Sequence, residues 1–434
     1  MPLFLSTTDP DFEAAFLALL AAKREDQGDV DAVVAAIIAD VRARGDAAVF
    51  ELTAKFDRLR LTPETMAFSP AEIEAECRKV SPDDRRALEL AAARIRDYHA
   101  RQMPEDQSWT DEFGAMLGWR WSAVASAGLY VPGGLASYPS SVLMNAIPAT
   151  VAGVKRLVIC APTPDGVCNP MVLLAARLAG VETIYRIGGA QAIAALAYGT
   201  QSILAVDKIT GPGNAYVAAA KRRVFGRVGI DMIAGPSEIL VIADRDNDPD
   251  WIALDLLSQA EHDESAQAIL ITDNAGFAQD VVAALERQVP LLERRAIAGA
   301  SWQQNGAVIV VRDLAEAAEL SDRIAPEHLQ LCIRDADGMA RMVSHAGAIF
   351  LGAWTPEAIG DYIGGPNHVL PTARSARFSS GLSVLDFVKR TTLARMTPAA
   401  LQAIGPAGER LAKSEGLQAH GQSIRLRLDR ANAG

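Results

Sequence analysis

The chain has 434 residues, of which 50% are hydrophobic and 22% are charged, as in a globular protein with room for two or three domains. Its net charge of −11 and its pI near 5.2 argue against nucleic acid or an anionic membrane as a partner. The four cysteines are scattered and form no C-x-x-C pair, which favours a reducing compartment and excludes a thiolate zinc site. The amino-terminal stretch "MPLFLSTTDPDFEAAF" has no basic region, so we expect no signal peptide and a cytoplasmic protein.

Residues 1–128 are predicted to form a mainly helical region that packs on the second of two α/β units. The stretch "DVDAVVAAIIADVRARGDAAVFELTAKFD" carries an apolar stripe at helical spacing. Ser69-Pro70 and Ser81-Pro82 are typical helix starts and predict two further helices. His99 lies in the second of these, among charged residues, where we expect it to be solvated.

The stretch from Trp121 to Val154 contains no Asp, Glu, Lys or Arg. It is long enough to suggest a membrane span, but three prolines and four glycines interrupt it. We therefore predict a buried, turn-rich region that either lines a pocket or serves as a structural crossover.

Strands and helices alternate after this point. "RLVICAPT", "TIYRIGG" and "VDKITGPG" are predicted strands that each run into a turn and then a helix, and together they predict a first Rossmann-like unit over residues 129–237. "EILVIAD", "QAILITD", "GAVIVVRD", "LQLCIRD" and "GAIFLGA" predict a second over residues 238–385. These runs are apolar throughout, as expected of parallel strands covered on both faces. Residues 386–434 are predicted to form a helical tail.

Three turns of the first unit could bind a ligand, because open α/β sheets bind ligands beyond the carboxyl ends of their strands. They are "GLYVPGG", "RIGGAQ" and "TGPGNAY". In the last, Gly211 and Gly213 precede a helix whose free N–H groups could hold a phosphate. The chain has no intact G-x-G-x-x-G, so this loop alone is a weak sign of a nucleotide site.

The helix "LLSQAEHDESAQ" places Gln259 one turn before His262, on the same helix face. The pair could bind a metal or a substrate, or it could belong to a solvated polar face. In "RIAPEHLQL", Glu327 and His328 lie where a helix ends and a strand begins. A carboxylate beside a histidine offers two proton acceptors of different pKa, but both can enter one pocket only if the turn is irregular. A surface position at a loop is an equal alternative.

Two further segments carry candidate side chains. The glycine- and proline-rich "TPEAIGDYIGGPNHVLPT" presents Asp361 and His368, and the tail segment "SEGLQAH" presents Glu415 and His420. Four of the six histidines thus fall in candidate sites. Glutamine, histidine and aspartate side chains without a thiolate suit zinc or manganese in an open site.

The chain resembles the histidinol dehydrogenase family along nearly its whole length. The matching stretches are "GLYVPGG", "YPSSVLMNAIPA", "GGAQAIAALAYGT", "GPGNAYV", "DMIAGPSEILVIAD", "LLSQAEHD", "APEHL", "GDYIGGPNHVLPT" and "FSSGLSV". So many long blocks in one order are far more specific than any single motif. Two positions, Asn247 and Gly364, depart from what we expect of the family, and neither has a proposed functional role.

The resemblance implies a cytoplasmic homodimer of Rossmann-like subunits that binds one zinc per subunit and reduces two NAD while it oxidises L-histidinol to L-histidine, in the last step of histidine biosynthesis. It implies that the tail of one subunit reaches the active site of the other. It also implies residue roles. Zinc would bind Gln259, His262, Asp361 and His420. His328 would be the main base, and Glu327 would activate water. The substrate would be contacted by the zinc ligands, His328, Ser237, His368 and Glu415. The NAD site would be lined by Tyr130, Gln191 and Asn214.

Aldehyde oxidation often uses a cysteine nucleophile, but Cys160 and Cys332 lie in apolar strands and are predicted to belong to the core. We therefore favour hydration of the aldehyde by water that Glu327 deprotonates. Two other functions remain possible from the residues alone: a zinc-dependent hydrolase of an imidazole-containing molecule, and a non-catalytic binding module for such a molecule.

Overall fold

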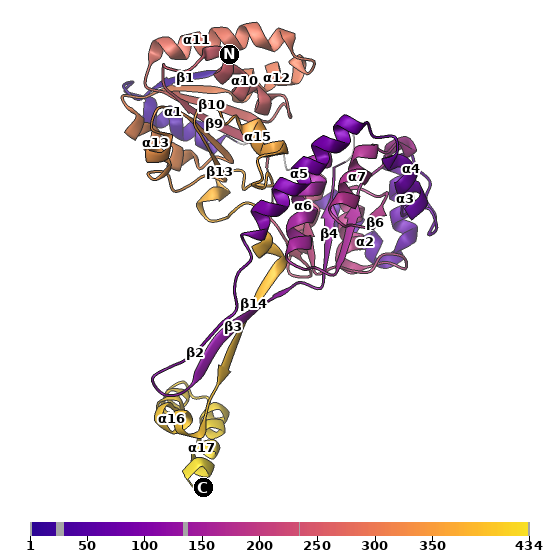
Figure 1. The fold of residues 1–434 in the computed structure, drawn as a ribbon, viewed down its shortest axis with the longest axis vertical. Coiled ribbons are helices and arrows are strands. Elements are labelled where there is room, and N and C mark those ends of the chain that lie inside the picture. Colours follow the sequence, from indigo (N-terminus) through magenta and orange to yellow (C-terminus); the bar gives the residue numbers. More distant parts are fainter. Residues whose placement is uncertain (1, 23–29, 133–137, 234, 433–434) are drawn as a thin grey trace.

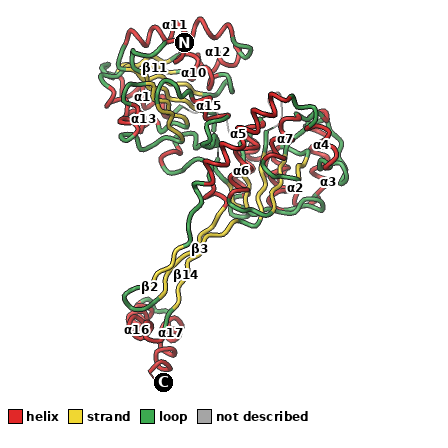
Figure 2. Tube along the Cα trace, in the orientation of Figure 1, coloured by secondary structure: helices red, strands yellow, loops and turns green. Residues whose placement is uncertain are grey.

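The computed structural model describes residues 2–22, 30–132, 138–233 and 235–432. Two α/β units lie next to each other, and a narrow β stalk extends from them to a pair of terminal helices (Figure 1). Figure 2 shows the same division by secondary structure, with the long strands of the stalk set apart from the two sheets. The predicted fold class, two parallel-sheet units with helical additions, is confirmed. Within the described ranges, no helix is long and apolar enough to cross a membrane.

The first unit is built on a five-stranded parallel sheet in the order β6-β5-β4-β7-β8. Its strands are β4 (Ser126–Tyr130), β5 (Arg156–Cys160), β6 (Thr183–Tyr185), β7 (Lys208–Thr210) and β8 (Gly229–Ile230). From β4, the next two strands along the chain are added on one side of the sheet, and β7 and β8 are added on the other. The boundary between β4 and β7 is where a doubly wound sheet opens a crevice for a ligand. Every residue of β4 is buried, as expected of a parallel strand that helices cover on both faces.

Helices cover both faces of this sheet. The helices that follow its strands are α6 (Pro139–Val151), α7 (Pro170–Leu178), α8 (Gly189–Tyr198) and α9 (Ala215–Val224). The amino-terminal helices are α2 (Val30–Arg44), α3 (Asp46–Phe56), α4 (Pro70–Cys77) and α5 (Pro82–Ala100). On one face α4 and α5 share a core with α6 and α7; on the other, α2 and α3 share a core with α8 and α9.

The prediction that residues 1–128 pack on the second unit was therefore wrong for most of the segment. The apolar stripe of α2 contacts α8 and α9 of the first unit, and α5 contacts α6. An apolar stripe shows that a helix face must be buried, but it does not specify which of two apolar surfaces covers it. The predicted helix starts were correct, since Ser69 Oγ accepts a hydrogen bond from Glu72 N and Ser81 Oγ accepts one from Asp84 N.

The second unit is a six-stranded parallel sheet in the order β1-β11-β10-β9-β12-β13. Its strands are β1 (Leu3–Ser6), β9 (Glu238–Ala243), β10 (Gln267–Thr272), β11 (Ala307–Val310), β12 (His328–Cys332) and β13 (Ala348–Leu351). The five predicted strands are all present, and β1 from the amino terminus adds a sixth by pairing with β11. Helices α10 (Pro249–Ala260), α11 (Ala275–Gln288) and α12 (Arg295–Asn305) cover one face, and α1 (Phe12–Ala21), α13 (Leu314–Ile324) and α14 (Ala336–Ala340) the other. A short helix, α15 (Glu357–Tyr362), follows β13.

The stalk is an antiparallel sheet of β2 (Gln107–Thr110), β3 (Met116–Ala123) and β14 (Val388–Arg395), in the order β14-β3-β2. It carries the terminal helices α16 (Pro398–Ser414) and α17 (Gln418–Asn432). The sequence predicted mainly helical structure for residues 1–128 and 386–434, the two segments that contain these strands, so that prediction was wrong for the stalk. Val388 pairs with Ala123, far away along the chain, and no local periodicity indicates such a pairing.

Candidate active site

Glu327 and His328 lie at the join between α13 and β12. The helix ends at Ile324, and Ala325 takes a left-handed conformation with φ of 50° before the strand begins at His328. This irregular turn meets the condition under which adjacent residues can face one pocket. Both side chains are buried, at 6% and 4% exposure, and Glu327 Oε2 lies 3.7 Å from His328 Nδ1.

The first residue of β9 holds both side chains through its backbone. Glu238 N donates a hydrogen bond of 2.9 Å to Glu327 Oε2. Glu238 O accepts a hydrogen bond of 2.8 Å from His328 Nδ1, so this ring nitrogen carries the proton in the neutral imidazole. The lone pair is then on Nε2, which is buried and has no hydrogen-bond partner among the described residues. His328 is thus oriented as a base.

The carboxylate of Glu357, which was not predicted from the sequence, lies beside His328 Nε2. Glu357, the first residue of α15, is 2% exposed, and its Oε1 is 3.5 Å from His328 Nε2. Asp361 lies one turn further along the same helix. Ligand atoms of His328, Glu357 and Asp361 all lie within 4.8 Å of one another. The four-residue spacing of the two acids in "TPEAIGDY" was the signal that could have identified Glu357, because such residues share a helix face.

His368 joins the cluster from the loop after α15 and connects it to the first unit. Its Nδ1 donates a hydrogen bond of 3.0 Å to Asp361 O and lies 3.7 Å from Asp361 Oδ1. Its Nε2 lies 3.3 Å from Ser141 Oγ, near the start of α6. The amino ends of β9 and β12 in the second unit therefore approach the part of the first unit that follows β4.

Gln259 and His262 reach this region from the end of α10, which packs against α15. The helix ends at Ala260, so His262 lies in the turn beyond it, and the prediction of one continuous helix face was wrong by two residues. A backbone hydrogen bond from His262 N to Gln259 O keeps the two residues together. Gln259 is 1% exposed, and within the described chain its Oε1 has no hydrogen-bond partner. A buried, unpartnered oxygen of this kind suits a metal ligand.

Burial determines the protonation of the cluster. Burial raises the pKa of Glu327 well above its usual value, and the negative charges of Glu238, Asp361 and Glu357 raise it further. Burial lowers the pKa of His328 and of His368, and in both cases the charge of His262 adds to the lowering. The two imidazoles are therefore neutral near pH 7, and His328 can accept a proton.

The three side chains predicted to line the NAD site lie at the carboxyl edge of the five-stranded sheet. Tyr130 is the last residue of β4, and its hydroxyl accepts a hydrogen bond of 3.1 Å from Gly189 N at the start of α8. Gln191 is 2% exposed in the first turn of α8. Asn214 caps α9, and its Oδ1 accepts a hydrogen bond from Val217 N. A cavity of about 510 Å³ opens at this edge between the loops that follow β4 and β5.

Two of the predicted substrate and metal residues are remote from the cluster. Glu415, at the end of α16, and His420, in α17, are exposed at the far end of the stalk (Figure 1). Ser237 directly precedes β9 and is therefore adjacent along the backbone to the residue that holds Glu327 and His328. Within one chain the structure thus brings together the body residues of the predicted site and leaves the tail residues apart.

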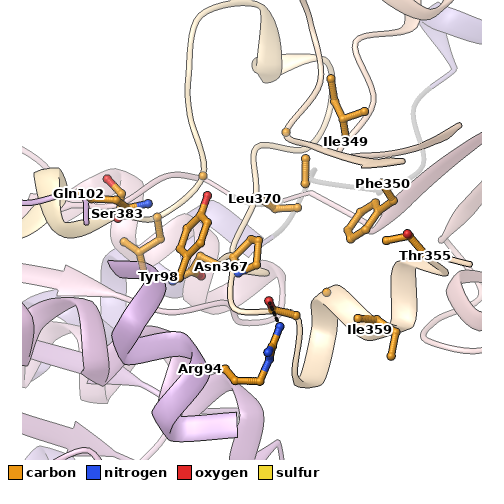
Figure 3. Close-up of a pocket in the computed structure, with 17 residues that line it drawn as sticks. Arg94, Tyr98, Gln102, Ile349, Phe350, Thr355, Ile359, Asn367, Leu370 and Ser383 are labelled. Carbon is orange, nitrogen blue, oxygen red and sulfur yellow. Dashed lines mark hydrogen bonds between the residues drawn. The ribbon is translucent and has the colours of Figure 1, made fainter. Parts of the chain in front are cut away.

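A second cavity, of about 460 Å³, lies between α5 and β13 (Figure 3). In the described part of the chain, none of the predicted site residues lines it. Arg94 closes one side by donating hydrogen bonds to the backbone oxygens of Ile363 and Gly364. The Nδ2 of Asn367, a residue that lines this cavity, lies 3.3 Å from His99 Nε2. His99 is fully buried, contrary to the solvated position expected from its charged neighbours, and its Nδ1 donates a hydrogen bond to Ile95 O.

Comparison with known proteins places the chain in one family. The histidinol dehydrogenase family profile matches residues 20–428. The chain is 76% identical over 434 residues to a histidinol dehydrogenase of Cereibacter sphaeroides and 73% identical over 432 residues to one of Ruegeria pomeroyi, with full coverage of each relative. The crystal structure of histidinol dehydrogenase from Elizabethkingia anophelis superposes with a TM-score of 0.95 at 36% identity and covers 99% of both chains. The chain belongs to the histidinol dehydrogenase family.

Proposed function

We propose that this protein oxidises L-histidinol to L-histidine through the aldehyde and reduces two NAD in turn. Family membership supports the substrate and the cofactor. The observation that carries the chemistry is the buried pair of Glu327 and His328, in which Nδ1 of the imidazole is tied to Glu238 O and Nε2 is free to take a proton. Oxidation of an alcohol to an acid needs successive proton acceptors of this kind.

The residues present fit a metal beside this pair. We propose that Gln259, His262 and Asp361 bind zinc together with His420 of the partner subunit. The buried, unpartnered Oε1 of Gln259 supports this assignment, and so does the donor set of amide oxygen, imidazole and carboxylate. Zinc, when bound, would supply a Lewis acid that anchors the imidazole and amine of the substrate. Manganese would suit the same donors.

The first oxidation depends on His328. Its Nε2 accepts the hydroxyl proton of the substrate while the carbinol carbon loses a hydride. The negative charge of Asp361, which opposes the lowering of the His328 pKa by burial, would stabilise the imidazolium that forms. NAD, when bound near Tyr130, Gln191 and Asn214, would supply the hydride acceptor.

The second oxidation depends on Glu327. Its carboxylate removes a proton from water, which adds to the aldehyde, and the resulting hydrate loses the second hydride to give the acid. A thiol route through either cysteine of the apolar strands has no support in the geometry. Cys332 is buried in β12 and burial raises its pKa to about 11, and the thiol of Cys160 is fully buried in β5. We further propose that Ser237, His368 and Glu415 of the partner subunit contact the substrate.

The remote position of Glu415 and His420 supports a homodimer in which each tail completes the site of the other subunit. A tail that ends far from its own body can contribute a metal ligand only by reaching another copy, and exchange of terminal segments is a common basis for dimers. We also propose that the protein acts in the cytoplasm, where its four free thiols would stay reduced.

The test is to mix the metal-loaded protein with histidinol and NAD and to follow the near-ultraviolet absorbance of NADH. A dehydrogenase produces two NADH for each histidine formed. A zinc-dependent hydrolase or a binding module for imidazole compounds would produce none, and that result would overturn the proposal.

A further inference from the structure

A buried ion pair that takes no part in the chemistry lies beneath the carboxyl edge of the five-stranded sheet. Lys221 comes from α9, and Asp231 directly follows β8. Their side chains are 3% and 1% exposed, and Lys221 Nζ contacts Asp231 Oδ1. Such burial of two opposite charges needs a reason, because desolvation costs about as much free energy as the attraction returns.

Both members of the pair hold the same backbone residue. Lys221 Nζ donates a hydrogen bond of 2.9 Å to Gly211 O. Gly211 N donates a hydrogen bond of 2.8 Å to Asp231 Oδ2. The ion pair thus occupies the amide hydrogen and the carbonyl oxygen of the first residue after β7.

Gly211 begins the segment Gly211–Asn214, which leads from β7 into α9. Its φ of +116° is a conformation that residues with a side chain rarely adopt. A Cβ atom at this position would lie 2.0 Å from Tyr130 O, so the segment is pressed directly against the end of β4. The ion pair therefore sets the spacing between Tyr130 and Asn214, two of the three residues assigned to NAD.

The free energy of a buried ion pair indicates that this pair does more than stabilise the fold. Well-packed apolar side chains of similar volume often stabilise a protein as much as a buried ion pair does, or more. Apolar side chains could not accept the hydrogen bond from Gly211 N or donate one to its carbonyl oxygen. What the pair supplies, and an apolar pair could not, is a defined position for this backbone.

We propose that Lys221 and Asp231 are positioning residues for NAD: they hold the segment Gly211–Asn214 in the conformation that binds the cofactor, and they touch neither the substrate nor the metal. This inference rests on the proposed use of NAD by the first unit. It assigns a function to two buried charges that have no part in the proposed proton transfers.

The decisive variant is the double substitution Lys221→Met with Asp231→Leu, which removes both charges together and also removes both hydrogen bonds to Gly211. We expect it to keep the thermal midpoint close to that of the wild type while the NAD dissociation constant, measured by calorimetry on the full-length metal-loaded protein, rises about 10-fold to 100-fold. The KM for NAD should rise in parallel, and the histidinol affinity and the metal content should stay unchanged. The matched control is Arg222→Met, an exposed cation on the same helix, which should leave NAD affinity unchanged.

A folded double variant that binds NAD as the wild type does would overturn the proposal and leave the pair a purely structural role. Lys221→Arg provides a second test that keeps the charge. The bulkier guanidinium cannot occupy the ammonium site without displacing Gly211, so NAD affinity should fall, and unchanged affinity would also count against the inference. If the wild type itself did not bind NAD, the proposed function would be contradicted. That result differs from loss or retention of NAD affinity in the variants, which tests the role of the ion pair.

Discussion

The two ring nitrogens of His328 have different tasks, and their surroundings separate them. Nδ1 is bonded to Glu238 O, and Nε2 is buried without a hydrogen-bond partner in the described chain. A backbone acceptor cannot change its protonation, so it keeps the proton on Nδ1 whenever the ring is neutral. The basic nitrogen therefore always faces Glu357 and Asp361, and the charge of Asp361 can stabilise it once it is protonated.

Glu327 carries the first prediction at this scale. Glu327→Gln keeps the size of the side chain and an oxygen that can accept the hydrogen bond from Glu238 N, but it removes the carboxylate that we propose activates water. We expect oxidation of the aldehyde to slow by a factor of about 10²–10⁴ and oxidation of the alcohol to persist. Single-turnover measurements started from histidinol and, separately, from histidinal would resolve the two steps.

The matched comparison is His328→Gln. Unlike Glu327→Gln, it should slow oxidation of the alcohol in addition to oxidation of the aldehyde. If Glu327→Gln slowed only the alcohol step, the roles assigned to Glu327 and His328 would have to be exchanged.

At the scale of elements, a chain of buried polar groups fixes α15 against β12. Gln330 is fully buried, two residues after His328 in β12. Its Oε1 accepts a hydrogen bond of 3.0 Å from Glu357 N, and its Nε2 donates one of 2.6 Å to Asp255 Oδ2 in α10. One amide thus ties three elements together and determines where Glu357 and Asp361 lie.

Asp255 makes the stability of this arrangement depend on pH. Burial raises its pKa from 3.8 to about 6, although the hydrogen bond from Gln330 opposes the shift. The folded protein therefore holds this proton more tightly than the unfolded chain, so the associated stability is complete below pH 4 and is lost as the pH rises through 6. The loss is at most about 3 kcal/mol.

We expect Asp255→Asn, which keeps an oxygen for Gln330 and cannot ionise, to raise the unfolding free energy at pH 8 but not at pH 4. Denaturant unfolding at the two pH values would measure this difference. Asp280→Asn, at an exposed position of α11, is the matched control and should show no such dependence. An equal effect of Asp255→Asn at both pH values would contradict a penalty caused by ionisation.

The division of the site between two sheets leads to a prediction about metal removal. Gln259, His262 and Asp361 belong to the second unit, whereas Tyr130, Gln191 and Asn214 belong to the first. We expect a chelator to abolish turnover and leave NAD binding largely intact, as measured by calorimetry, with activity returning when zinc is added. Parallel loss of NAD affinity in a protein whose circular dichroism is unchanged would contradict this separation.

At the scale of the whole molecule, the stalk separates the terminal helices from the body of their own subunit. If the tail completes the site of a second subunit, two inactive chains can restore each other. We expect co-expression of His328→Ala chains with His420→Ala chains to return about one active site in four, because half of randomly paired dimers are hybrids with one intact site. The measurement is NADH formation by the whole co-expressed mixture, compared with the wild type at the same protein concentration.

The control is to pair His328→Ala chains with Asp361→Ala chains. Both lesions then lie in the body, so no hybrid contains an intact site and no activity should return. If the first pair also failed to recover activity although hybrid dimers were demonstrated, each tail would have to serve its own subunit and the shared site would be wrong.

Much of the fold was predictable because its signals are local. Uninterrupted apolar runs of strand length identified β9 to β13, and serine caps identified the starts of α4 and α5. The main errors concern which helix surface or strand each element packs against or pairs with. The packing of α2 on the first unit and the pairing of β3 with β14 depend on surfaces that are distant along the chain, and a periodic pattern carries no information about them.

The candidate site divides in the same way. The sequence by itself determined the family, because runs of specific residues in a fixed order are properties of the chain alone. It also predicted Gln259, His262, Glu327, His328 and Asp361 as site residues. Only the tertiary structure decided that Glu357 faces His328, that Lys221 and Asp231 clamp Gly211, and that Glu415 and His420 lie far from the body. These are contacts or separations in space between residues far apart along the chain, and packing sets such distances once the whole chain has folded.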